Sequence, residues 1–403
     1  MRDLDGDDFS YIVATQKNTL DNGGKIGHTE IEKHFYERWD RMVKQLASIA
    51  EVAKRAGVSV ASASRVLSSS TYPVSAETRD KVMKAAAELN YAPNSLARSL
   101  RVQRSNLIAV LVGNNADPYF AEIVRGVEEV ANQAGYLTIV CNSGRDPAKE
   151  LHYLHILQDY RVDGVIFAGS ALNETGHPKQ LEHVVQSIVD RGAAVTTLAQ
   201  HTLHVPSIQP DNFGGARQMT AHLIALGHRR IAFVTGPANV MTANVRLQGY
   251  MAALAEAGLP IDPILLLPGS YDRVSGEQAV DSLVHMEPEQ RPTAVFAAND
   301  ETALGVLSGL WLRGWQVPEE MSVCGFGDTP MAQVVVPKLT TVHMGLHELG
   351  RAGAYKLLAQ LRREQVPFLE VLPATVVERD TTAALLSPPS RNDIQGETAS
   401  MMA

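Results

Sequence analysis

The residues with the clearest chemical potential in this sequence lie between Ser48 and Leu67, where short helices are indicated on both sides of Gly57. Ser48 and Glu51 have the spacing of a capping box, which predicts that a first helix starts there. After Gly57, Ser59 can cap a second helix whose exposed face is small and lightly charged: Val60, Ala61, Ser62, Ser64 and Arg65. Ser59 and these five residues are the expected DNA-binding residues of this helix. Such a face lets a helix approach the base edges in the major groove of DNA, where hydrogen bonds and apolar contacts read the sequence.

Apolar residues at helical spacing provide a core for this segment. Ala63, Val66 and Leu67 can face inward from the second helix, and Ser75 can cap a third helix. The third helix carries its own apolar residues at helical spacing: Val82, Ala85, Ala86 and Leu89. Together these features predict an all-α helix-turn-helix domain over residues 42–91, although the same pattern also fits an ordinary small helical domain.

A second motif follows directly, and it runs from Asn90-Tyr91-Ala-Pro93 to Leu100. With it, the segment from Leu46 to Arg101 resembles the lactose/galactose repressor family of bacterial transcription regulators. The resemblance implies that residues 92–104 are a hinge, which folds into a short helix on the operator. Leu100 corresponds to the leucine that is wedged into a central CpG step from the minor groove. The hinge residues implied to contact DNA are Asn94, Ala97, Arg98, Leu100 and Arg101.

Charge divides the chain in the same way. Residues 42–104 hold 10 Lys and Arg against 4 Asp and Glu, whereas residues 1–41 hold 6 against 9 and the whole chain carries a net charge of −8. A basic segment joined to an acidic body indicates that DNA contact is confined to one end of the protein.

At 403 residues the chain is long enough for a small domain and one or two domains of ordinary size. No apolar run approaches the roughly 18 residues of a membrane span, and the acidic start is no secretory signal, so we expect a cytoplasmic protein. Residues 1–41 are expected to be disordered or untranslated, with Met42 as the natural start, and residues 384–403 to be a disordered tail. Cys141 and Cys324 are expected to be buried free thiols.

From Ser105 onward, short apolar runs alternate with segments of helical period, which predicts a parallel, doubly wound α/β sheet. Helices are predicted at residues 121–134 and 149–160. Buried strands are predicted in two series, 107–112, 137–141, 164–168 and 194–198, then 231–234, 264–267, 294–297 and 322–326. Two such sheets indicate two lobes with a cleft between them at the carboxyl ends of the strands.

The family resemblance extends to about residue 380 through short motifs in the family's order: 117–122, 161–164, 211–212, 225–231, 298–300 and 339–342. It implies a periplasmic-binding-protein-like, two-lobed effector-binding and dimerisation domain over residues 105–383. The expected lobes are residues 105–227 with 346–373, and residues 228–343 with 374–383.

The resemblance also implies a set of effector-binding residues: Tyr119, Phe120, Thr242, Arg246, Tyr271, Asn299 and Asp328. Arg246 is the strongest of these, because a guanidinium can hold two vicinal hydroxyls or a carboxylate bidentately; the alternative is a surface arginine. Tyr271 could be an aromatic platform or a core tyrosine. Asn299 could bind the ligand or cap a helix. Asp328 stands one residue later than the acidic residue of many relatives, which leaves its reach into the cleft open.

No candidate enzyme motif in the sequence has the spacing that its chemistry requires. Gly325-x-Gly327 lacks the third glycine of a dinucleotide fingerprint, and His347-Glu348 lacks the second histidine of a zinc-protease helix. Histidine pairs at 152/155 and 201/204 have no further residues that would complete a metal site. We therefore expect no catalysis, no metal and no cofactor.

Together these features predict a homodimeric, ligand-responsive transcription regulator, most consistent with a repressor. Two recognition helices related by a twofold axis read a palindromic operator, since one short helix reads too few base pairs. The effector expected for the family is a sugar or sugar acid, with a nucleobase as the weaker option. A sugar-binding module without a role on DNA is the remaining alternative.

Overall fold

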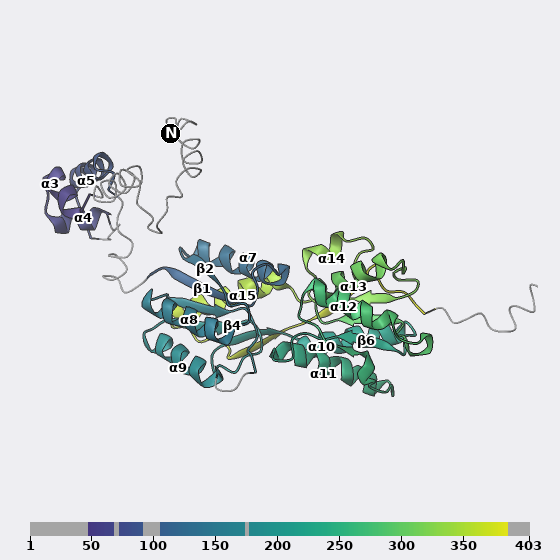
Figure 1. Ribbon diagram of the computed structural model, residues 1–403. Coiled ribbons are helices and arrows are strands. Elements are labelled where there is room, and N and C mark those ends of the chain that lie inside the picture. Colours follow the sequence, from purple (N-terminus) through teal and green to yellow (C-terminus); the bar gives the residue numbers. More distant parts are fainter. Residues whose placement is uncertain (1–46, 68–71, 92–104, 174–176, 386–403) are drawn as a thin grey trace, which may run out of the picture. The chain divides into compact units, whose positions relative to one another are not determined.

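The computed structural model describes residues 47–67, 72–91, 105–173 and 177–385 (Figure 1). The chain divides into two compact units, Met1–Arg98 and Ser99–Ala403, and each unit is described by itself.

The first unit contains three helices, α3 (Ile49–Ala56), α4 (Val60–Leu67) and α5 (Ala76–Glu88). Ser48 and Glu51 form the predicted capping box, and Gly57 ends α3 in the left-handed conformation with φ of 67°. The Ser59 hydroxyl accepts from the Ser62 amide at 3.1 Å at the start of α4. Ser75 caps α5 by accepting from the Thr78 amide. Local capping chemistry thus sets where each helix begins.

The three helices share one small core. Its buried side chains are Val52, Ala53, Ala63, Val66, Val82, Ala85 and Ala86. Leu67 and Leu89, which the sequence also assigned to the core, are only partly buried against it. The prediction of a three-helix core is confirmed, with small residues dominating its centre.

Replacing Ser48 by alanine should loosen the start of α3. The Ser48 amide donates to the Glu51 carboxylate at 2.6 Å, and the Ser48 hydroxyl accepts from the Glu51 amide at 3.3 Å. Losing the side-chain half of this box costs about 1 kcal/mol, or roughly fivefold in the opening equilibrium. Hydrogen exchange of the full-length protein should show faster exchange in α3. Ser105, which lies outside any helix, is the control: Ser105→Ala should leave hydrogen exchange in α3 unchanged.

The second unit begins with a six-stranded parallel sheet in the order β11-β5-β4-β3-β1-β2. Its strands are β1 (Leu107–Val112), β2 (Leu137–Asn142), β3 (Gly164–Phe167), β4 (Ala194–Thr197), β5 (Ser207–Pro210) and β11 (Leu369–Leu372). Helices α7 (Pro118–Gln133) and α15 (Leu346–Leu361) contribute to the core on one face, and α8 (Pro147–Asp159) and α9 (His177–Asp190) to the core on the other.

A four-stranded parallel sheet in the order β7-β6-β8-β9 forms the second lobe. Its strands are β6 (Ile231–Val234), β7 (Leu266–Leu267), β8 (Ala294–Ala297) and β9 (Ser322–Cys324). Helices α10 (Asn212–Ala225) and α11 (Met241–Glu256) cover one face, and α12 (Arg273–Val284) and α13 (Asp300–Leu312) the other, followed by the short α14 (Pro330–Val334) (Figure 1). Strands β10 (Thr341–His343) and β12 (Thr375–Val377) pair antiparallel.

One lobe boundary differs from the expectation. The sequence placed residues 105–227 in the first lobe, but α10 packs along α11 of the second lobe. The contact is close because Gly249 has no side chain where it faces the Phe213 carbonyl and Ala216. The chain therefore changes lobe after β5 and not after α10. The other limits given for the domains stay predictions.

Two strand predictions also need correction. The first half of residues 264–267 belongs to a 3-10 turn, Pro263–Leu265, which Asp262 caps, and only Leu266–Leu267 is strand. Strand β2 is not fully buried, because it lies at the edge of its sheet and Leu137 is 63% exposed. In the part of the chain that the structure describes, no helix is both long and apolar enough to cross a membrane.

Candidate functional site

Helix α4 presents the face that the sequence predicted. Val60, Ala61 and Arg65 are exposed and Ser62 and Ser64 are half-buried, whereas Ala63 and Val66 point into the core. The guanidinium of Arg65 lies 4.3 Å from the centre of the Tyr72 ring, which steadies the end of the helix. The exposed face has small residues at its start and Arg65 at its end, and its contacts with base edges stay a prediction.

The hinge predictions fall outside the described residues. Asn94, Ala97, Arg98, Leu100 and Arg101 all lie within residues 92–104, so their contacts with DNA stay predictions.

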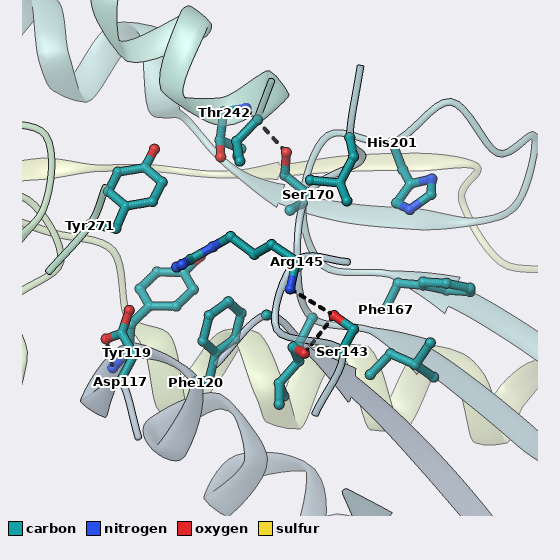
Figure 2. Close-up of a pocket in the computed structure, with 18 of the residues that line it drawn as sticks. Asp117, Tyr119, Phe120, Ser143, Arg145, Phe167, Ser170, His201, Thr242 and Tyr271 are labelled. Atoms are coloured by element: carbon teal, nitrogen blue, oxygen red, sulfur yellow. Dashed lines mark hydrogen bonds between the residues drawn. The ribbon is translucent and has the colours of Figure 1, made fainter. Parts of the chain in front are cut away.

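The second unit contains a cavity between its two lobes, with a volume of about 70 Å³ (Figure 2). The first lobe contributes residues that follow its strands, such as Ser143 after β2, Ser170 after β3 and His201 after β4. The second lobe contributes the start of α11 and the residues after β7 and β8. This is the carboxyl edge of both sheets, where ligands bind open α/β folds.

Six of the seven predicted effector residues line this one cavity: Tyr119, Phe120, Thr242, Arg246, Tyr271 and Asn299. Tyr119 and Phe120 lie in the first turn of α7, where their rings meet edge to face at 5.0 Å. Asp117 fixes this turn because its carboxylate accepts from the Tyr119 amide at 3.0 Å, and Pro118 starts the helix. Burial raises the pKa of Tyr119 to about 12, so its hydroxyl stays a hydrogen-bond donor.

Arg246 is buried, with 4% of its surface exposed, and is therefore not a surface arginine. Its Nε donates to the Asn212 side chain at 2.9 Å, and its Nη1 donates to the Ala298 carbonyl at 2.5 Å. The guanidinium also lies 4.0 Å from the centre of the Phe326 ring. These contacts with uncharged groups orient the guanidinium of Arg246. They leave other N–H groups of Nη1 and Nη2 free to donate to a molecule in the cavity.

Tyr271 and Asn299 are connected to each other. Asn299 caps α13 by accepting from the Thr302 amide at 3.0 Å, and its amide nitrogen donates to the Tyr271 carbonyl at 3.1 Å. Tyr271 has a left-handed backbone with φ of 64°, and its hydroxyl is buried without a hydrogen-bond partner among the described residues. Asn299 therefore caps α13 and also lines the cavity.

Asp328 lies away from the cavity lining. Its carboxylate accepts from the Arg379 guanidinium at 2.5 Å and pairs with the His343 ring at 2.8 Å. The preceding Gly327 has φ of 143° and Asp328 itself has φ of 55°. The extra glycine therefore turns the carboxylate toward the crossover strand β10, and the expectation that Asp328 binds the effector is not supported by its position.

Several polar residues of the cavity were not predicted: Asp117, Ser143, Arg145, Glu150, Ser170 and His201. Burial raises the pKa of Asp117 to about 6. Burial, with a smaller effect of His177, lowers the pKa of His201 to about 3, so this ring is neutral at neutral pH. Ser143 and Arg145 could have been found by asking which polar side chains lie in the turn after β2.

The two lobes touch at the edge of the cavity. The Thr242 amide donates to the Ser170 hydroxyl at 3.1 Å, and Leu172 and Val240 form an antiparallel bridge. The structure therefore shows the lobes in contact across the cavity. Within the described residues, no group of three or more His, Cys, Asp or Glu could hold a metal ion.

Comparison with known proteins gives the family. Residues 48–94 match the family described as bacterial regulatory proteins, lacI family, and residues 220–382 match a periplasmic binding protein-like domain. The HTH-type transcriptional repressor PurR of Haemophilus influenzae strain PittEE is 32% identical over 347 residues, which cover 84% of this chain and all of that protein.

Solved structures agree. The lac repressor dimer bound to operator and an anti-inducer is 29% identical, with a TM-score of 0.73 over 84% of this chain and 99% of that one. A complex of the transcriptional regulator CelR with cellobiose is 31% identical, with a TM-score of 0.61 over 83% of this chain and 99% of that one. The chain therefore belongs to the lacI family of bacterial regulatory proteins, and it is a DNA-binding transcription regulator with a ligand-binding domain.

Proposed function

We propose that this protein is a homodimeric, cytoplasmic repressor that binds a palindromic operator and responds to a sugar or sugar acid in the interlobe cavity. The observation that carries the proposal is the buried Arg246, whose fork is oriented into a cavity lined by aromatic rings and hydroxyls. Such a mixture suits a small hydroxylated ligand, which stacks on rings and binds through its hydroxyls. The similar CelR was solved with cellobiose.

The proposed control is a shift between two conformations. Residues from both lobes line the cavity, so a ligand there favours one arrangement of the lobes over the other. The hinges, which lie outside the described residues, would then bind the operator with altered geometry.

Operator selection followed by a gel shift tests this proposal. Full-length protein should enrich one palindrome from a random DNA pool, and a sugar or sugar acid should change its affinity for that palindrome. Enrichment of no palindrome would leave the sugar-binding module without a role on DNA as the better description.

An exposed apolar surface supports the dimer. Trp311, Leu312, Val334 and Val336 are 76%, 65%, 66% and 91% exposed, and Trp311 and Val336 line one groove. Exposed large apolar side chains such as Trp311 and Val336, which share this groove, are typical of a protein interface. The lac repressor in the operator complex is a dimer.

Val336→Asp should weaken this dimer. A carboxylate at the most exposed of the four positions must be desolvated when the surface is covered, so we expect at least tenfold weaker dimerisation. Sedimentation velocity over a concentration series measures the change. Ile261→Asp changes an exposed isoleucine elsewhere in the same lobe and should have no effect; equal dissociation in both variants would contradict the assignment.

A further inference from the structure

Two guanidinium groups enter the cavity from opposite lobes. Arg145 follows β2 of the first lobe, and Figure 2 shows its side chain extended across the cavity toward Tyr271. The guanidinium carbon of Arg145 lies 5.4 Å from the centre of the Tyr271 ring, and that of Arg246 lies 5.8 Å from the same centre. The two cations therefore converge on one aromatic ring.

Neither cation forms an ion pair within the described residues, although the charge of Arg145 acts on the Asp117 carboxylate and favours its ionised form. Among the described residues, no carboxylate lies within 4.0 Å of either guanidinium, and Arg246 bonds only to neutral groups. For Arg145, the side chain makes no hydrogen bond to a described residue, although it is half-buried. Withdrawing a guanidinium from water without a counter-charge is costly, and two neighbouring ones also repel each other.

The two acids of the cavity also have contacts of their own. The Asp117 carboxylate caps α7 through the Tyr119 amide; burial raises its pKa to about 6, and the charge of Arg145 opposes this rise. Glu150 lies 3.8 Å from the buried ring of His177. His201 is neutral at neutral pH and adds no positive charge of its own. The positive charge that faces the centre of the cavity therefore comes from Arg145 and Arg246.

We propose that the effector is an anion, a small hydroxylated molecule with a carboxylate or phosphate group that Arg145 and Arg246 hold between the lobes. A carboxylate or phosphate accepts parallel hydrogen bonds from a guanidinium, which a neutral hydroxyl does less well. The Tyr271 hydroxyl, which is buried without a hydrogen-bond partner among the described residues, and the Thr242 hydroxyl remain for the uncharged part of the ligand. This inference rests on the proposed function and narrows its ligand class.

The anion would also join the lobes directly. Arg145 belongs to the first lobe and Arg246 to the second, so one charged group placed between them removes their repulsion and bonds to both. A neutral sugar would leave that repulsion in place. The charge of the ligand would thus decide how strongly it favours contact between the lobes.

The test uses full-length protein and matched pairs of ligands. Thermal shift is measured with D-galacturonate against D-galactose, D-gluconate against D-glucose, and glucose 6-phosphate against D-glucose. We expect at least one anion to stabilise the protein and its neutral partner to do so much less; the first two pairs report a carboxylate and the third a phosphate. Calorimetry on the best anion should then show at least tenfold weaker binding to Arg145→Gln. Arg161→Gln is the matched control, because Arg161 is an exposed arginine of the same lobe with a left-handed backbone (φ of 52°) like that of Arg145 (φ of 59°), and it should bind as the wild type does.

The results separate this inference from the proposed function. If a neutral sugar binds as tightly as its acid, or if Arg145→Gln keeps full affinity for the anion, the anionic effector is refuted while ligand control of the operator stands. If none of the anions and none of the neutral sugars binds, the inference also fails. The gel shift on the selected operator then shows whether the DNA-binding proposal fails with it.

Discussion

Arg246→Ala is expected to weaken effector binding by roughly 1.5 to 3 kcal/mol, or about 10- to 150-fold, while operator affinity without effector stays the same. The substitution removes the buried, oriented donors that face the cavity. The three-helix domain has its own core and should keep reading DNA. If the effector releases the repressor, the cell stays repressed; if the effector strengthens binding, the target genes stay expressed. Calorimetry with the anion found in the thermal-shift series gives the direct measurement.

The controls separate binding from folding. Arg246→Met keeps most of the packing against Phe326 without the hydrogen bonds and should lose affinity as Arg246→Ala does. Arg217→Ala removes an exposed arginine of the same lobe that pairs with Glu256, a contact of little energetic value, and should bind effector normally. Wild-type affinity in Arg246→Ala would mean that the effector binds elsewhere.

Local sequence signals were sufficient for most of the fold. The start of α3 follows from the side chains of Ser48 and Glu51, which are three residues apart, so no distant contact is needed to predict it. Strand β1 begins and ends as expected because it is buried and its apolar run is continuous. The prediction of a strand over residues 264–267 was wrong, because Asp262 and Pro263 stabilise a turn that leaves only a two-residue strand. The lobe of α10 depends on packing against Gly249, which no local signal reports.

The sequence predicted some residues of the candidate site and not others. Tyr119, Thr242 and Arg246 could be carried over because the resemblance fixes their positions, and they line the cavity. Asp328 could not be placed from sequence, because its direction depends on the backbone angles at Gly327 and on the ion pair with Arg379. Arg145 has no counterpart in the motifs, and its approach to Tyr271 is visible only when both lobes are present. The family motifs therefore predicted where the cavity lies, and the structure was needed to identify the two arginines that give it positive charge.

Replacing Val60 and Ala61 together by larger polar residues, Gln and Asn, is expected to redirect the operator sequence. Both residues stand first on the exposed face of α4, and Val60 is 48% exposed, so they are placed to contact base edges rather than the core. Each mismatched base pair costs about 1 to 3 kcal/mol, and a dimer meets the change in both half-sites. We therefore expect roughly 2 to 6 kcal/mol weaker binding to the wild-type palindrome, with a different half-site recovered by selection from a random DNA pool.

The matched control changes two exposed positions of α5, Met83→Gln and Ala87→Asn, which keep the same kinds of substitution on a helix not expected to read bases. This variant should select the wild-type palindrome. Effector affinity should be unchanged in both variants, because the cavity is built by the second unit alone. Selection with the wild type should recover one palindrome with a central CG, the step at which the resemblance places Leu100. An unaltered preference in the Val60 and Ala61 variant would show that other residues choose the base pairs.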